Sequence, residues 1–355
     1  MAVAPVILKT NPHRPVDFKE SAVLKVLAAS GNLNLEVKED GCQLNMVVEY
    51  DKDGAHVFFL SREGKMFNGL VDLGAKLSAD DRWHKFFNPH LDAGLFRDRG
   101  GFMLQAEILI DGKVCAEIAG DMRRMSPIDV SKIEIVAFDL IPYDIVEAGC
   151  DYEVYQELRM MHTGIQVDAL KSRFPEIKWR CVDMVPVYSL AQLMEAYEVF
   201  RHDKKEGGVA KDPLSYWKRG KKTGQWKIKP DDECDGVITG LMWGTPGLAN
   251  EGRVIGFTVL TEHGVEVEAG GLTEAQKDEF TEKVRIHTLE NCYAFTPDPS
   301  LTVESLVKNL PEGFNWNPYD QNAVKITYME RLPSGSYRHP NFDSFRGITD
   351  PLTKE

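Results

Sequence analysis

The sequence has few of the features that mark membrane, secreted or zinc proteins. No apolar run approaches the roughly 20 residues that cross a bilayer, and residues 1–9 lack the basic start and long apolar segment of a signal peptide. The six cysteines include no Cys-x-x-Cys pair, and the nine histidines include no His-x-x-x-His spacing. These absences argue against a disulfide framework and against structural zinc. We therefore expect a soluble, intracellular protein with no membrane partner.

Positive charge is also in the minority. The 355 residues contain 42 Lys and Arg against 55 Asp and Glu, a net charge of −13. Taken as a total, this charge argues against a nucleic-acid partner. A total is weak evidence, however, because a basic stripe on an acidic protein can still follow a phosphate backbone. The length suffices for two domains with sizeable cores.

Hydrophobic periodicity predicts a mixed α and β chain that divides near residue 230. Before the division we expect strands at 33–38, 43–50, 56–61, 102–110, 133–140, 207–212 and 225–229, with helices at 17–30, 152–172 and 189–202 and a helix start at Ser78. The acidic, proline-started segment 230–235 separates domains at 1–230 and 235–355. Beyond it, strands at 236–243, 253–261, 264–268 and 323–331 with a helix at 273–288 suggest a small OB-type β-barrel.

Lys38 ends a strand just before the hairpin turn signal Asp40-Gly41. This position holds its amine at the mouth of a sheet, close to a carboxylate. A lysine amine is a nucleophile only when uncharged, which requires desolvation or neighbouring positive charge. Lys-x-Asp-Gly by itself is a common surface turn, so the hypothesis depends on the segments that follow it.

Five later segments supply the residue types that a nucleotide needs. They are Ser61-Arg62, Glu107 within a strand, Phe138-Asp139, Glu206 to Lys211, and Lys227-Ile228-Lys229. A nucleotide needs a stacking ring for its base, acceptors for its sugar and amine, and cations with a divalent metal for its phosphates. Strand alternation aims Lys227 and Lys229 at one face. Either an anionic ligand or a solvated edge explains that pair.

Between these segments, Tyr216 to Trp226 interleaves cations with aromatic rings. This mixture suits a phosphate backbone. The segment is not a P-loop, because Gly220-Lys221 is followed by Lys222 rather than by Ser or Thr.

Taken in order, these motifs resemble the covalent nucleotidyltransferase superfamily, and within it the compact ATP-dependent DNA ligases of bacteriophages. Phage-type stretches at 216–224, 243–252 and 338–347 add to the resemblance, which covers nearly the whole chain. It implies an α+β fold, in which a nucleotidyltransferase (adenylation) domain of antiparallel sheets with flanking helices occupies 1–230. A small β-barrel OB-fold domain that binds DNA follows at 235–355. The location would be the host cytoplasm if a phage encodes the chain.

The resemblance implies an enzyme that seals nicks in duplex DNA during replication, repair or recombination. Lys38 would attack the α-phosphate of ATP to form lysyl-AMP, with Mg²⁺ as the expected ion. The adenylate would pass to the 5′-phosphate at a nick. Attack by the 3′-hydroxyl would then form the 3′–5′ phosphodiester bond and release AMP. The partner would be nicked duplex DNA, clamped by a monomer.

The resemblance also implies roles for single residues. Catalysis falls to Lys38, Lys227 and Lys229. Nucleotide binding falls to a larger set, with Glu36 reading the adenine amine and Phe138 stacking on the base: Glu36, Val37, Arg62, Glu107, Phe138, Lys227 and Lys229. The metal ligands are Glu206 and Glu107. The DNA-binding residues are Lys211, Lys218, Arg219, Lys221, Lys222, Arg338 and Arg346.

Two departures from the family pattern bear on activity. Gln43 stands where an arginine is usual, and Gln105-Ala106-Glu107 stands where Asp-Gly-Glu is usual. The nucleophile and the metal carboxylate remain, so we expect an active enzyme. Three alternatives stay open: an RNA ligase, a GTP-using capping-type nucleotidyltransferase, and a catalytically decayed nucleic-acid-binding module.

Overall fold

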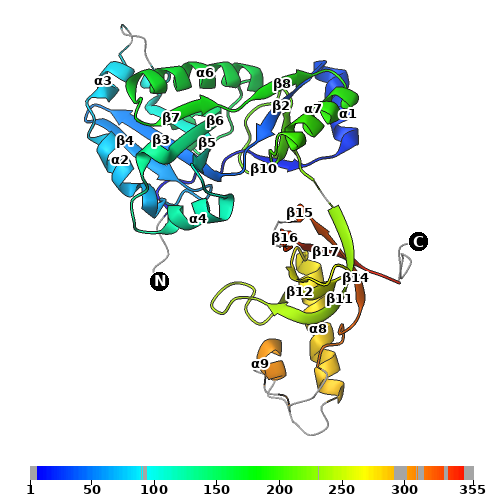
Figure 1. Ribbon diagram of the computed structural model, residues 1–355. Coiled ribbons are helices and arrows are strands. Elements are labelled where there is room, and N and C mark those ends of the chain that lie inside the picture. The colour runs from blue at the N-terminus through cyan, green and yellow to red at the C-terminus, as the bar shows by residue number, and fades with distance from the viewer. Residues whose placement is uncertain are drawn as a thin grey trace. The chain divides into compact units, whose positions relative to one another are not determined.

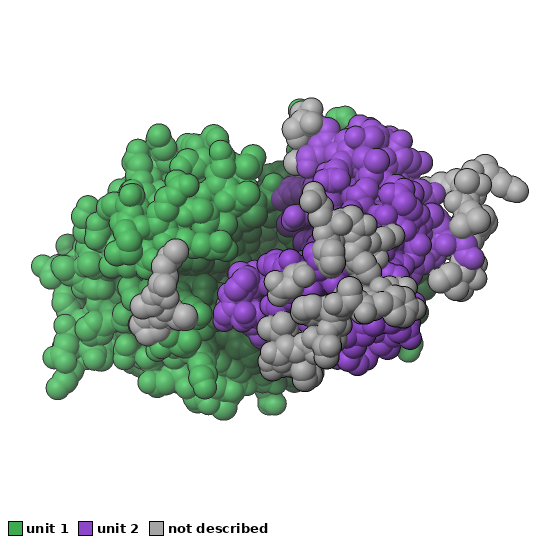
Figure 2. Space-filling view, turned by 90° about the horizontal axis from the view of Figure 1, so that it is seen from below, with its two compact units in different colours: residues 1–229 green, residues 230–355 purple. Residues whose placement is uncertain are grey.

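The structure is a computed structural model that describes residues 6–88, 90, 94–230, 232–291, 302–308, 310, 316–331 and 335–347. The chain divides into two compact units, Met1–Lys229 and Pro230–Glu355, which are green and purple in Figure 2. We call them unit 1 and unit 2 and describe each by itself. None of the described helices combines the length and apolar character needed to cross a bilayer.

Unit 1 is built on two five-stranded, mainly antiparallel sheets. The first has the order β1-β10-β9-β2-β8, with strands Arg14–Asp17, Lys221–Ile228, Gly207–Lys211, Leu33–Lys38 and Met184–Val187. The second has the order β4-β3-β5-β6-β7, with strands Gly54–Leu60, Cys42–Asp51, Gly101–Ile110, Ile133–Pro142 and Lys178–Cys181. Only two pairings among these strands, β1 with β10 and β6 with β7, are parallel.

Helices flank both sheets of unit 1, as predicted (Figure 1). α1 (Glu20–Ser30) and α7 (Leu190–His202) pack against the first sheet over a core that includes Leu33, Leu35 and Trp226. The second sheet shares its core with α2 (Val71–Ser78), α3 (Arg82–Phe86), α4 (Cys115–Arg123) and α6 (Gln156–Arg173). The remaining pieces are α5 (Tyr143–Glu147) and single turns of 3₁₀ helix at Asn68–Leu70, Arg97–Arg99 and Val130–Lys132.

One helix start was predicted wrongly. Ser78 is the last residue of α2, and α3 begins at Arg82. The Ser78 hydroxyl donates to the Gly74 carbonyl at 2.8 Å and accepts from the Val57 N–H at 2.8 Å. Serine can bond back to the preceding turn as readily as it can cap the next one, and here the backward bond is formed.

Strand β2 positions the residues around Lys38. Its side chains alternate, so Leu33, Leu35 and Val37 enter the helix-covered core. Glu36 and Lys38 therefore share the opposite face. The turn after Lys38 lies close to β5, because a Cβ on Gly41 would lie 2.4 Å from the Ile108 carbonyl oxygen. Glycine is thus required where the Lys38 hairpin meets the strand that carries Glu107.

Unit 2 is a five-stranded antiparallel sheet in the order β13-β12-β11-β14-β17. Its strands are Glu266–Ala269, Val254–Thr261, Asp232–Trp243, Ala323–Tyr328 and Asn341–Phe345. A short hairpin, β15 (Glu330–Arg331) with β16 (Tyr337–Arg338), and the helices α8 (Glu274–Asn291) and α9 (Val303–Lys308) complete it. Phe257 and Phe280 join strand and helix in one core. The predicted β-rich second domain with one long helix is confirmed.

The described strands of unit 2 do not make a continuous closed barrel. The two edges of the sheet meet at a single bridge between Gly270 and Asn341. There the Gly270 N–H donates to the Pro340 carbonyl at 3.2 Å, and the Phe342 N–H donates to the Gly270 carbonyl at 2.9 Å. The sheet therefore curls until its edges touch, and between the described residues of these edges only these two backbone hydrogen bonds are formed. Strand β17, which makes this contact, was not predicted.

Candidate active site

A pocket of about 440 Å³ in unit 1 is lined by strands from both sheets. A cavity of this size suits a nucleotide-sized ligand. It brings together nine of the residues singled out from the sequence: Glu36, Val37, Lys38, Arg62, Glu107, Phe138, Lys211, Lys221 and Lys227. They come from strands β2, β5, β6, β9 and β10 and from the end of β4.

Lys38 is ion-paired with Glu206. Its Nζ donates a short hydrogen bond to Glu206 Oε2, and the two side chains are 27% and 11% exposed. The β2–β9 ladder explains the contact, because Lys38 is paired in register with Gly207, the residue after Glu206. The nucleophile candidate and the metal-ligand candidate are therefore neighbours across a strand pair.

Glu107 contributes a second carboxylate near Lys38. Burial in the pocket wall raises the pKa of Glu107 to about 8, the Lys38 amine lowers this pKa, and the Glu206 carboxylate raises it. Two carboxylates that influence each other in this way provide hard oxygen ligands of the kind that Mg²⁺ prefers. Gln43 lies beside Glu107 in the β3–β5 ladder and also lines the pocket, with an uncharged amide.

Glu36 and Lys211 form a buried ion pair at the same pocket. Lys211 Nζ lies 2.7 Å from Glu36 Oε2, and the side chains are only 1% and 4% exposed. Burial raises the pKa of Glu36, and the Lys211 charge opposes that rise. Lys211 Nζ also donates to the Phe138 carbonyl at 3.0 Å. Lys211 was predicted to contact DNA, and this prediction is wrong because a side chain so buried cannot reach a phosphate backbone.

Phe138 supplies the aromatic surface of the pocket. Its ring is half-buried, and Lys211 Nζ lies 5.3 Å from the ring centroid. Val136, Val182 and Val209 add apolar surface to the same lining. Flat rings and branched aliphatic side chains are what a nucleotide base needs for stacking.

Arg62 also lines the pocket but keeps 55% of its side chain exposed. It pairs with its neighbour Glu63 at 2.7 Å. An ion pair with this exposure contributes little to stability. Arg62 can therefore exchange Glu63 for an anionic ligand at small cost.

The two lysines of the Lys227-Ile228-Lys229 motif differ in their relation to the pocket. Lys227 lines the pocket, whereas Lys229 follows the end of β10 and, among the described residues, lies outside the lining. Asp17 holds Lys227 at 2.9 Å and Lys221 at 3.0 Å through its two oxygens. Hydrogen bonds from these lysines lower the pKa of Asp17 to about 2. Asp17 thus fixes two cations at the pocket rim.

His13 is a pocket residue that the sequence did not indicate. Burial lowers the pKa of His13 to about 4, so the ring is neutral at ordinary pH. Its Nε2 lies 3.2 Å from the Lys222 carbonyl, and Gln225 Nε2 lies 3.2 Å from its Nδ1. His13 therefore ties the pocket to the basic segment. Its position between Pro12 and Pro15 in an extended lead carries no motif that would have identified it.

In the basic segment 216–226 some cations are exposed to solvent, and another is hydrogen-bonded within unit 1. Lys218 and Lys222 are exposed. Arg219 instead donates to the backbone carbonyls of Lys9 and Val146. Trp217 is fully buried, and its indole N–H donates to Gln105 Oε1. This contact gives the departure at Gln105 a structural reason.

Arg346 in unit 2, predicted to bind DNA, is held in an ion pair within unit 2. Its side chain is 8% exposed and pairs with Asp235, with N–O distances of 2.8 and 2.7 Å. The pair fastens the end of β17 to β11. Arg338 lies in β16 and is half-buried.

Comparison with known proteins defines the class. Residues 18–229 match the family model of the ATP dependent DNA ligase domain, and residues 230–346 match that of the DNA ligase C-terminal domain. The chain belongs to the ATP-dependent DNA ligase family. These matches favour a DNA ligase over an RNA ligase or a capping-type nucleotidyltransferase.

The particular relatives are phage enzymes. The chain is 37% identical to the DNA ligase of Escherichia phage T7 over 97% of this chain and 98% of the relative. It is 35% identical to the DNA ligase of Enterobacteria phage T3, with the same coverage. The structure of the ATP-dependent DNA ligase from bacteriophage T7 in complex with ATP superposes with a TM-score of 0.59. It is 36% identical and covers 96% of this chain and 99% of that one. The predicted family and fold class are confirmed.

Proposed function

We propose that this chain seals nicks in duplex DNA, using Lys38 as the residue that accepts AMP from ATP. One observation carries the proposal: the Lys38 amine lies at a nucleotide-sized pocket, hydrogen-bonded to the Glu206 carboxylate, and the carboxylate of Glu107 lines the same pocket. In the adenylation step Lys38 would first lose its ammonium proton to solvent. Its Nζ then bonds to the α-phosphorus, and the bond between that phosphorus and the oxygen it shares with the β-phosphate breaks, releasing pyrophosphate. Such transfers depend on positioning and charge neutralisation.

Unit 1 would bind the nucleotide through distinct groups. Phe138 stacks on the base, and Glu36, held by Lys211, accepts from the adenine amine. Val37 adds apolar surface, and Arg62 and Glu107 contact sugar and phosphate. Lys227 neutralises phosphate charge at the rim, and Lys229, two residues further along the chain, is a further phosphate cation.

Glu206 and Glu107 fit a divalent cation. Both are carboxylates near Lys38, and the charge of Glu206 raises the pKa of Glu107, which shows that the two oppose each other. A cation between them would relieve this repulsion. Bound Mg²⁺ supplies neutralisation of the phosphate charge that builds up as pyrophosphate departs. Lys38 would then leave Glu206 for the α-phosphate.

The DNA partner would be a nicked duplex held by both units. In unit 1, Lys218 and Lys222 are exposed, and Lys221 is half-exposed at the rim. Arg219 supports their segment from within. Unit 2, including Arg338, would contact the duplex so that a monomer clamps around it. The predicted domains, 1–230 for adenylation and 235–355 for duplex binding, correspond to these two roles.

A sealing assay with matched substrates tests the proposal. Duplexes with a single nick in DNA or in RNA are incubated with the protein, Mg²⁺ and either ATP or GTP. We expect sealing of nicked DNA with ATP, and loss of sealing in Lys38→Ala. Sealing with GTP alone, or of RNA alone, would contradict the proposal. Binding of nicked DNA without any sealing would indicate a decayed module.

A further inference from the structure

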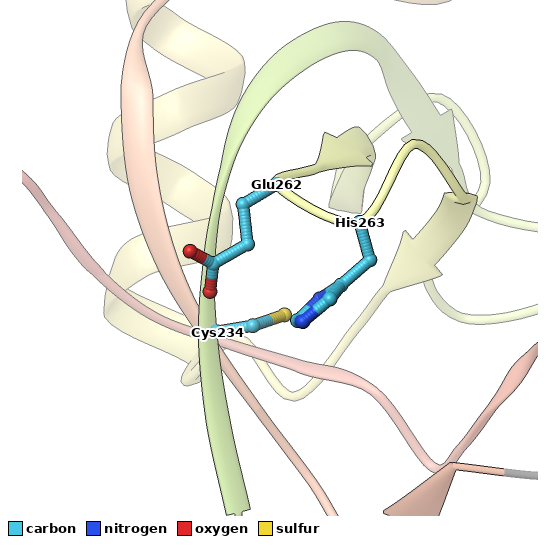
Figure 3. Close-up of side chains that lie close together, drawn as sticks. All are labelled: Cys234, Glu262 and His263. Atoms are coloured by element: carbon cyan, nitrogen blue, oxygen red, sulfur yellow. The ribbon is translucent and has the colours of Figure 1, made fainter.

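A cluster of metal-ligand side chains lies in unit 2, apart from the pocket of unit 1. It contains Cys234 of β11 with Glu262 and His263 of the turn between β12 and β13 (Figure 3). The candidate ligand atoms, one from each residue, all lie within 4.8 Å of one another. In Figure 3 the imidazole ring of His263 points toward the Cys234 sulfur, and the Glu262 carboxylate points toward the strand that carries Cys234.

The strand register explains why these residues meet. β11 and β12 are antiparallel, and Gly236 is paired with Thr261. Residues just before Gly236 therefore face residues just after Thr261. The Glu262 N–H donates to the Asp235 carbonyl at 2.7 Å, which continues the ladder into the turn. No local spacing motif marks the cluster, because the whole of β12 separates its two parts in the sequence.

Neighbouring groups hold these side chains in place. The Tyr337 hydroxyl lies 2.8 Å from His263 Nδ1. The Asp235 N–H donates to Glu262 Oε1 at 3.1 Å. Cys234 is fully buried in the core of unit 2. Hydrogen bonds of this kind orient the imidazole and carboxylate ligands of metal ions.

We infer that Cys234, Glu262 and His263 bind one Zn²⁺ ion that fastens the β12–β13 turn to β11. A thiolate, an imidazole and a carboxylate together suit Zn²⁺, whereas Mg²⁺ prefers oxygen ligands alone. Ligand atoms in a tetrahedral zinc site lie about 3.5 Å apart. The exposed side chains of Glu262 and His263 would therefore have to move their ligand atoms only about 1 Å closer to reach this spacing. The Cys234 thiol loses its proton to solvent on binding, and water completes the coordination.

The site is structural and independent of the ligase reaction, so its test does not depend on sealing activity. Full-length protein without an affinity tag is stripped of metal with a chelator. It is then titrated with Zn²⁺ against a chromogenic chelator in excess Mg²⁺, which occupies the carboxylates of unit 1. We expect one Zn²⁺ per chain and a higher melting temperature of unit 2. Titration with Co²⁺ should give thiolate-to-cobalt absorption.

Variants locate the site. His263→Ala and Cys234→Ser should each weaken Zn²⁺ binding at least tenfold and abolish the thermal shift. His202→Ala and Cys181→Ser, which alter an exposed imidazole and a half-buried thiol outside the cluster, serve as controls and should bind as the parent does. His263 is exposed, so its variant should fold even if Cys234→Ser does not. Unchanged binding in His263→Ala, or Co²⁺ spectra without a thiolate band, would overturn the inference.

Discussion

Replacing Glu107 with glutamine should make the free protein more stable in alkaline solution. In the native protein burial raises the pKa of Glu107 from its ordinary 4.5 to about 8. Between these values the native carboxyl holds a proton that the unfolded chain has lost. Stability linked to this proton is fully present below the unfolded value and is lost as pH rises through the native one. Glutamine is neutral at every pH, so the variant keeps that stability.

The size of the effect follows from the shift. One pKa unit corresponds to about 1.4 kcal/mol, which sets an upper limit of about 5 kcal/mol. Glu107 lines an open pocket, where water reduces the penalty on its charged form, so we expect about 2–3 kcal/mol. Glutamine has nearly the same shape and can still accept a hydrogen bond from the Gly41 N–H. Packing differences should therefore contribute little.

Urea unfolding of the metal-free and nucleotide-free proteins measures this difference. The parent and Glu107→Gln should have similar unfolding free energies at about pH 5. At about pH 9 the variant should be the more stable of the two. Glu63→Gln is the matched control, because the pKa of Glu63 is lowered by Arg62 and its loss should bring no alkaline gain. A difference between parent and Glu107→Gln that stays constant with pH would refute the reasoning.

Three further substitutions test other parts of the site. Lys211→Met leaves Glu36 buried without its cation and should lower the unfolding free energy by about 3–5 kcal/mol in urea denaturation; a neutral result would contradict the buried pair. His13→Phe keeps the ring but loses the bond to the Lys222 carbonyl. It should weaken binding of nicked DNA about fivefold, measured by fluorescence anisotropy, and unchanged affinity would count against His13 as a positioning residue. Replacing Lys218 and Lys222 with alanine should lower the salt slope of DNA binding by about 2 while sparing adenylation; an unchanged slope would make the segment a solvated face.

The strand residues around Lys38 were predictable because their signal is local. Alternation from Leu33 to Lys38 gives the strand, and Asp40-Gly41 gives the turn that ends it. Two-residue periodicity also places Glu36 and Lys38 on one face. These contacts depend on neighbours in the sequence, and the structure matches them.

Contacts between distant segments were not predictable in the same way. The pairing of Glu36 with Lys211 requires β9 to lie beside β2. Hydrophobic periodicity predicts strands, but it does not predict which strands are neighbours in a sheet. Lys211 consequently looked like a surface cation. The pairing of Arg346 with Asp235 was not predictable for the same reason, since the two residues lie on different strands of the sheet of unit 2. The order of the family motifs along the chain identified the pocket residues. Which cations are ion-paired and which are exposed is visible only in the three-dimensional structure.

The most direct test of the central claim is mass spectrometry of the protein after exposure to ATP and Mg²⁺. We expect one added AMP per chain, found on the peptide that contains Lys38 and absent from Lys38→Ala. Glu63→Gln, outside the reacting groups, should carry the same adduct as the parent. An unmodified Lys38, or AMP attached to another residue, would contradict the account.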